Sequence, residues 1–190
     1  MPLISNGPGD VTLGTDDRAR AVAAVKARLR VASNGEDALI AAFAETALGL
    51  AEQFTGRVLI ARDLAAILPV IGGWQRLTAV PVQRIETIEG LASDGTATAL
   101  PLIDYAIDID AQGQGWVRIG DAGGASRVRV TLTAGAVASW DAVPAALREG
   151  VTLLAAYLYA AQDVSQPPPA AITALWRPYR QMALAPAGHA

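Results

Sequence analysis

The stretch EDALIAAFAETALGLAEQFTGRVLI, residues 36–60, contains the change of periodicity that decides the fold class. Its first part predicts a helix over 36–55, because the apolar side chains recur at steps of three and four residues. The stripe consists of Ile40, Phe43, Ala47, Leu50 and Phe54, while Glu45 and Glu52 lie off it. Thr55-Gly56-Arg57 follows, and glycine favours the left-handed residue that ends many helices. From Val58 the apolar period changes to two, so strands are expected to begin where this helix ends.

Further helices are predicted on both sides of this stretch. One covers 15–31, with acidic residues in its first turn and basic residues in its last, the order that the helix dipole favours. Another starts at Pro144 and covers 144–162, and a short one covers 170–177. The stripe of the long helix consists of Leu147, Val151, Leu154, Leu158 and Ala161. We expect its Leu154 and Leu158 to pack against Leu50 and Phe54 of the preceding helix, as stripes of this kind pair across a core.

The middle of the chain, residues 58–135, is predicted to form a small, mostly antiparallel sheet. Residues 127–133 and 105–110 alternate between apolar and polar side chains, as half-buried strands do. The side chains expected to face the core are Val128, Val130 and Leu132 on the former strand and Tyr105, Ile107 and Ile109 on the latter. Turns are expected at 93–95 and 112–115. Two helices, a strand region, a long helix and a short final helix together predict an α+β fold.

The domain organisation is predicted from composition. A chain of 190 residues is long enough for one domain that buries a core without disulfides. Residues 1–14 are rich in glycine and proline and are expected to form an irregular N-terminal arm. Residues 15–163 form the main domain. The remainder, 164–190, is a proline spacer of polyproline type at 165–169, followed by a C-terminal segment.

Several classes of function are excluded by the composition. The chain has no cysteine, and His189 is its single histidine, so a thiolate zinc site, a thiol nucleophile and a Ser-His-Asp triad are excluded. Asp104, Asp108 and Asp110 are explained by strand alternation and carry no acid–base site. A net charge of −3 argues against nucleic-acid binding over the whole surface, and no signal peptide or membrane span is visible. We expect a protein made in the cytoplasm, with no catalytic activity, cofactor or metal.

The C-terminal segment combines aromatic, apolar and basic side chains and has no acidic one. Tryptophan, tyrosine and arginine are the residue types that most often anchor interfaces. The candidate docking residues are Ile172, Leu175, Trp176, Arg177, Tyr179 and Arg180. Two interpretations remain open from the residues alone: a mobile limb that the proline spacer holds away from the core, or a C-terminal helix packed on the chain's own core.

Six short motifs occur in one order along the chain. They are Val25-Lys-Ala-Arg-Leu-Arg-Val31, Gly35-Glu-Asp-Ala-Leu-Ile40, Phe54-Thr-Gly-Arg57, Val130-Thr-Leu-Thr-Ala-Gly135, Val143-Pro-Ala-Ala-Leu-Arg148 and Leu175-Trp-Arg-Pro-Tyr-Arg180. Over about residues 20–182 the chain thereby resembles the head–tail connector, or adaptor, proteins of long-tailed phages and of phage-derived gene transfer agents. The alanine-rich composition favours the gene transfer agent version. The arm, residues 1–14, has no counterpart in this resemblance.

The resemblance implies a structural role in the neck of a phage or gene transfer agent particle. In such proteins a ring of about twelve copies lies beneath the portal and forms the channel through which DNA leaves without being bound specifically. It also implies that the C-terminal segment engages the portal protein, and that a stopper or tail protein lies on the other side of the ring. The alternatives are a head-completion stopper or tail-terminator protein and, from another class, a small ligand-binding module.

Overall fold

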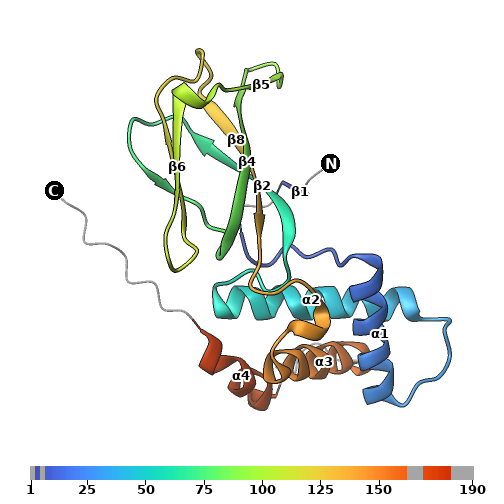
Figure 1. Ribbon diagram of the computed structural model, residues 1–190. Coiled ribbons are helices and arrows are strands. Elements are labelled where there is room, and N and C mark those ends of the chain that lie inside the picture. Colours follow the sequence, from blue (N-terminus) through green and yellow to red (C-terminus); the bar gives the residue numbers. More distant parts are fainter. Residues whose placement is uncertain (1–2, 5–6, 162–168, 181–190) are drawn as a thin grey trace.

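A computed structural model describes residues 3–4, 7–161 and 169–180 of the chain. The helices gather at one end of the molecule and the strands at the other, which confirms the predicted α+β fold (Figure 1). The helices are α1 (Thr15–Leu29), α2 (Asp37–Thr55), α3 (Ala145–Ala160) and α4 (Ala170–Trp176), with short 3-10 turns η1 (Leu102–Asp104), η2 (Trp140–Ala142) and η3 (Arg177–Tyr179). The predicted proline spacer lies outside the described residues, apart from Pro169.

The strands form two sheets where the sequence predicts one. The strands are β1 (Leu3–Ile4), β2 (Arg62–Pro69), β3 (Gln75–Arg76), β4 (Val82–Leu91), β5 (Ala97–Ala99), β6 (Tyr105–Ile109), β7 (Gly115–Ile119) and β8 (Arg127–Ala134). The larger sheet has the order β1-β2-β8-β4-β5, and the smaller one has the order β3-β7-β6. Both predicted turns are confirmed, since β4 with β5 and β6 with β7 form antiparallel pairs.

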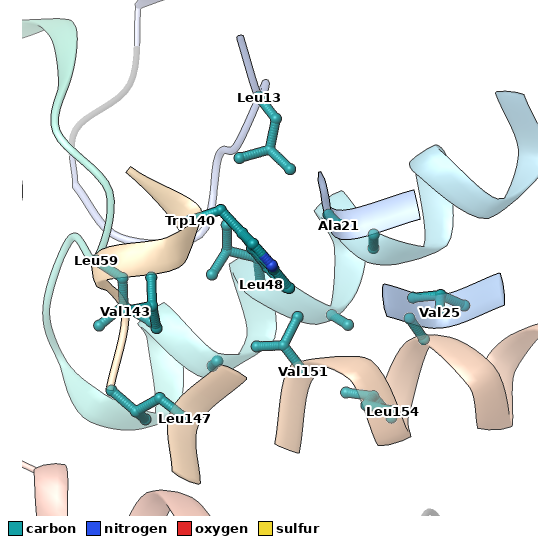
Figure 2. Close-up of a cluster of buried hydrophobic side chains, with 14 of the residues drawn as sticks. Leu13, Ala21, Val25, Leu48, Leu59, Trp140, Val143, Leu147, Val151 and Leu154 are labelled. Atoms are coloured by element: carbon teal, nitrogen blue, oxygen red, sulfur yellow. The ribbon is translucent and has the colours of Figure 1, made fainter. Parts of the chain in front are cut away.

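A first core lies between the helices. Trp140 of η2 is 2% exposed and lies in the middle of this core, between Leu13 of the N-terminal arm and Val151 of α3 (Figure 2). Its backbone N–H donates to Asp17 Oδ1 of α1 at 2.8 Å, which ties η2 to that helix. The core therefore joins the arm, the helices α1 to α4 and the turn that leads into α3.

Helices α2 and α3 pack together as expected, but the prediction that Leu50 lies between them is wrong. Leu50 is 43% exposed, while Leu154 is buried and Phe54 and Leu158 are partly buried. The buried residues of α2 are mostly small, and they are Ile40, Ala41, Ala44, Ala47, Leu48, Gly49, Ala51, Glu52 and Thr55. Small side chains let neighbouring elements approach closely, so the alanines of α2 mark its inner face better than its large residues do.

A second core lies between the two sheets. Val128, Val130 and Leu132 of β8 are at most 1% exposed, as predicted, because β8 is the central strand of the larger sheet. The prediction for β6 is wrong in part: Ile107 and Ile109 are 44% and 38% exposed. Ile107 pairs with the buried Val117 of β7 and shares its face, but β6 is the edge strand and has a neighbouring strand on one side only in the described sheet.

The N-terminal arm is fastened to α2 along its length from residue 7. Leu13 N–H donates to Glu45 Oε1 at 2.9 Å, and Gly9 N–H donates to Glu52 Oε2 at 3.1 Å. A Cβ atom at Gly49 would lie 2.5 Å from the carbonyl oxygen of Gly9, so only glycine at that position lets the arm cross α2 this closely. The arm from Gly9 to Leu13 is thus attached to the helical core, while Leu3–Ile4 form the edge strand β1 beside β2, where the sequence predicts irregular structure.

Within the part of the chain that the structure describes, no helix combines the length and apolar character needed to cross a membrane.

Candidate functional site

Two segments that are far apart in the sequence meet at the end of α2. The rings of Phe54 and Trp176 have centroids 5.8 Å apart at an interplanar angle of 55°. The Arg180 guanidinium carbon lies 5.7 Å from the centroid of the Phe54 ring, within the range of a cation–π contact. The motif that ends α2, residues 54–57, and the last motif, residues 175–180, therefore form one surface.

The end of α2 fixes the backbone of Arg57. Gly56 has a φ of 72°, and the N–H groups of Gly56 and Arg57 both donate to the carbonyl of Glu52, at 2.8 and 3.1 Å. This is the helix ending that the Thr-Gly-Arg motif predicts. The Thr55 hydroxyl donates to the carbonyl of Ala51 at 2.8 Å and adds to the same turn. The position of the Arg57 backbone just after α2 is consequently fixed.

The described part of the C-terminal segment, residues 169–180, packs on the chain's own core, so of the two interpretations left open by the sequence the packed helix is correct for these residues. Trp176 and Ile172 are each 3% exposed and belong to the helical core. The indole Nε1–H of Trp176 donates to the carbonyl of Leu147 at 3.4 Å. A Cβ atom at Gly150 would lie 2.2 Å from that Nε1, so the glycine in the middle of α3 makes room for the ring.

The candidate docking residues therefore fall into three groups. Ile172 and Trp176 face inward, whereas Arg177 and Arg180 are exposed. Leu175 and Tyr179 are partly buried and pack against the edge of the core. The inward pair fixes α4, and the exposed residues of η3 and beyond are available for a partner.

A pocket of about 350 Å³ opens beside this surface. It is lined by Thr55, Arg57, Leu59, Ala136, Val137, Val143, Pro144, Leu147, Pro178, Tyr179 and Arg180. The lining is largely apolar and includes two arginines and no carboxylate. Its residues come from the end of α2 and the segment after it, from the segment that follows β8, from the start of α3, and from η3 with Arg180, so the pocket lies where these distant segments meet.

A buried ion pair that the sequence reasoning missed joins the helical end to the strand end. Glu52 is 0% exposed, and its two carboxylate oxygens accept from Arg62 Nη1 and Nη2 of β2, each at 2.8 Å. The carboxylate also accepts from the N–H groups of Leu59 and Gly9, at 2.9 and 3.1 Å. This bidentate pair is well satisfied and connects α2, β2 and the arm. Glu52 lies off the predicted apolar stripe, so periodicity gave no sign of its burial.

A second exposed surface lies at the opposite end of the molecule. Ile107 and Ile109 on the edge strand β6 are accompanied by residues of the preceding turn, Leu102 at 80% and Ile103 at 91% exposure. Exposed aliphatic side chains on an edge strand and the turn before it are typical of a surface that meets another protein.

The described residues contain no group of three or more histidine, cysteine, aspartate or glutamate side chains that could hold a metal ion. Asp108 is exposed on β6, and Asp110 accepts from the N–H groups of Gln112 and Gln114, each at 2.9 Å, as a turn residue does.

Known proteins match this chain in structure. No protein-family model matches the sequence, and no curated protein sequence matches it significantly. Solved structures do match over nearly the whole chain. A chain in the neck of an empty gene transfer agent particle, computed with C6 symmetry, superposes with a TM-score of 0.69 and 24% identity, covering 93% of this chain and 96% of that one.

This is the fold of a gene transfer agent neck protein. A chain in the neck of a native gene transfer agent particle, computed with C12 symmetry, gives a TM-score of 0.63 at 25% identity, with 94% of this chain and 97% of that one covered. A chain in the virion of a native gene transfer agent particle gives 0.67 at 22% identity, with the same coverage. The resemblance inferred from the six sequence motifs is thereby confirmed at the level of the fold.

Proposed function

We propose that this protein is a structural component of the neck of a gene transfer agent or phage particle, without catalytic activity, and that it acts there as the adaptor between the portal and the tail. The observation that carries the proposal is the match over more than nine-tenths of both chains to a protein in a gene transfer agent neck.

A ring of copies follows from the same proposal. The matching neck assemblies are described with C6 and C12 symmetry, and head-to-tail contacts between identical subunits close into a ring when the rotation per subunit divides the circle. About twelve copies would then surround the channel. Each carries a formal charge of −3, and a ring with that charge repels DNA passing through it and does not retain it.

The portal is the proposed partner of the C-terminal segment. Arg177 and Arg180 are exposed, and Tyr179 is partly exposed beside them. Ile172, Leu175 and Trp176 support this role by anchoring the segment to α2 and α3, so the basic and aromatic groups are held in place before binding. Rigid aromatic and arginine side chains contribute more to binding than mobile ones, because less conformational entropy is lost.

The opposite end is proposed to meet a neighbouring copy or the stopper or tail protein. Leu102 and Ile103 are the most exposed large apolar residues in the described part of the chain. Covering them would remove apolar surface from water, which is the main favourable term in association.

The proposal is tested by mixing the purified chain with the portal protein of the same particle and measuring the mass of the complexes in solution. The expected result is a complex that contains the portal and many copies of this chain. The double variant Arg177→Ala and Arg180→Ala is expected to bind at least tenfold more weakly, whereas Arg84→Ala, an exposed arginine on β4, is expected to bind normally. A chain that stays separate from an intact portal ring at all concentrations tested contradicts the proposal.

A further inference from the structure

We propose that the pocket between Arg57 and Arg180 binds an extended acidic segment of another protein chain, with one carboxylate at the arginines and a neighbouring aliphatic side chain on the apolar floor. The inference goes beyond the proposed function, because it concerns the chemistry of one pocket and holds whichever protein of the particle supplies the segment.

The charged side chains that line the pocket are all basic. Arg57 and Arg180 both line it, and no aspartate or glutamate does. The Nε atom of Arg57 is buried and has no hydrogen-bond partner among the described residues. Buried polar groups in folded proteins are nearly always paired, so this nitrogen leaves a place for a partner from outside the described residues. A carboxylate suits an arginine best, because the planar fork can donate two parallel hydrogen bonds.

Arg62 provides a contrast within the same molecule. It also carries a buried Nε without a partner, but both of its terminal nitrogens are taken by Glu52. Its charge is thus neutralised inside the protein. No ion pair is formed by Arg57 or Arg180 with any described carboxylate. Of these arginines, only the two in the pocket wall have charge to offer a ligand.

The apolar side chains at the floor of the pocket indicate what lies beside the carboxylate in the ligand. It includes Leu59, Val137, Val143 and Leu147, which favour an aliphatic group over water. The volume of about 350 Å³ lies within the range of pockets that hold compact ligands. A nucleic-acid phosphate would use the arginines but not the floor, whereas an acidic peptide with an aliphatic neighbour uses both. The observations therefore favour a peptide.

Both arginines are positioned before a ligand arrives. Arg57 follows the fixed end of α2, and Arg180 lies over the ring of Phe54, which itself contacts Trp176. A site whose groups are already in place loses little conformational entropy on binding.

The probe is the capped peptide acetyl-Gly-Leu-Asp-Leu-Gly-amide, titrated into the full-length protein while the arginine Nε–H and tyrosine ring signals are followed by NMR. We expect saturable shifts at Arg57, Arg180 and Tyr179. The matched peptide with asparagine in place of aspartate is expected to bind at least about tenfold more weakly, because it cannot form the charged fork. Equal binding of the two peptides, or no binding of either, overturns the proposal. Inorganic phosphate shifting the arginines as strongly as the acidic peptide also overturns it, in favour of an anion site.

Variants locate the binding. Arg57→Gln and Arg180→Ala should each weaken the acidic peptide at least about tenfold, while Arg127→Ala, an exposed arginine on β8, should leave it unchanged. Thermal unfolding of each variant shows that the fold persists. Retained affinity in both pocket variants contradicts the assignment. A full-length variant with Met182→Ser and Leu184→Ser addresses the chain's own terminal residues: if the acidic peptide binds to this variant alone, the occupant is the chain's own tail and the proposal is wrong. The portal-binding experiment has a different readout, so failure of either proposal is recognised separately.

Discussion

The helical end and the strand end of this molecule differ in how far their large apolar side chains are buried. At the helical end, large residues from widely separated segments close a core, as Trp140 at 2% and Trp176 at 3% exposure illustrate. At the strand end, Ile103 at 91% and Ile107 at 44% exposure lie on a turn and on the edge strand β6. Apolar residues recur regularly in both regions, at helical spacing in one and at strand spacing in the other, so the difference arises from what covers each element. The most exposed large apolar side chains of the described residues lie at the strand end.

The junction between the two ends is ionic. Glu52 of α2 and Arg62 of β2 are held by two hydrogen bonds of 2.8 Å, and Glu52 also accepts from the arm. A buried ion pair contributes little net stability, but removing one partner is costly because a charge is left uncompensated. This pair therefore fixes how the helices meet the sheets more than it adds to the overall free energy of folding.

The largest effect is expected from Trp176→Ala. The indole is buried in a slot over Gly150, so truncation should lower the free energy of unfolding by about 3–5 kcal/mol. Urea unfolding followed by circular dichroism measures this. A loss below about 1 kcal/mol, typical of surface positions, would mean that α4 is not part of the helical core. Leu102→Ala, at an 80% exposed position, is the matched control at the strand end.

A smaller effect is expected from Glu52→Gln at the junction. Arg62 would lose its charged partner but keep its bonds to the carbonyls of Asp10 and Ile60, so we expect a loss of about 2–3 kcal/mol in the free energy of unfolding.

The double variant Glu52→Gln with Arg62→Leu serves as the control, because it removes the uncompensated charge as well. Its loss should be smaller than the sum of the two single losses. Additive losses would show that the two side chains are not coupled and would contradict the geometry of the pair.

The smallest effect on stability is expected at the strand end. Leu102→Ser with Ile103→Ser should change the free energy of unfolding by no more than about 0.5 kcal/mol for each substitution, because both side chains are exposed. Association of the chain with itself or with its tail-side partner should nevertheless weaken, as measured by analytical ultracentrifugation. Thr98→Ala on β5, also exposed, should alter neither property. Unchanged association in the double serine variant would contradict a role of Leu102 and Ile103 in binding another protein or copy.

Much of the fold could be predicted from the sequence, because helix and strand periods and the glycine after Thr55 are local signals. Val128, Val130 and Leu132 were placed correctly since β8 is central and covered on both sides. Ile107 has the same alternation but lies at an edge, which depends on the order of strands and is not encoded locally.

The site was harder to predict than the fold, because it depends on contacts between distant segments. Both motifs that form it were identified, yet nothing local showed that Arg57 and Arg180 line one pocket. One signal was present and missed. Gly150 in the middle of a long apolar helix costs about 1 kcal/mol relative to alanine, so it indicates a close approach, here by the Trp176 ring. That signal favours a packed C-terminal helix over a free limb.

Electron microscopy of the purified chain bound to its portal protein tests the proposed role most directly. We expect a closed ring of about twelve copies, coaxial with the portal, in which η3 and Arg180 face the portal. A reconstruction in which the portal carries no ring of this chain, or in which the chain binds with its strand end toward the portal and η3 free, would contradict it.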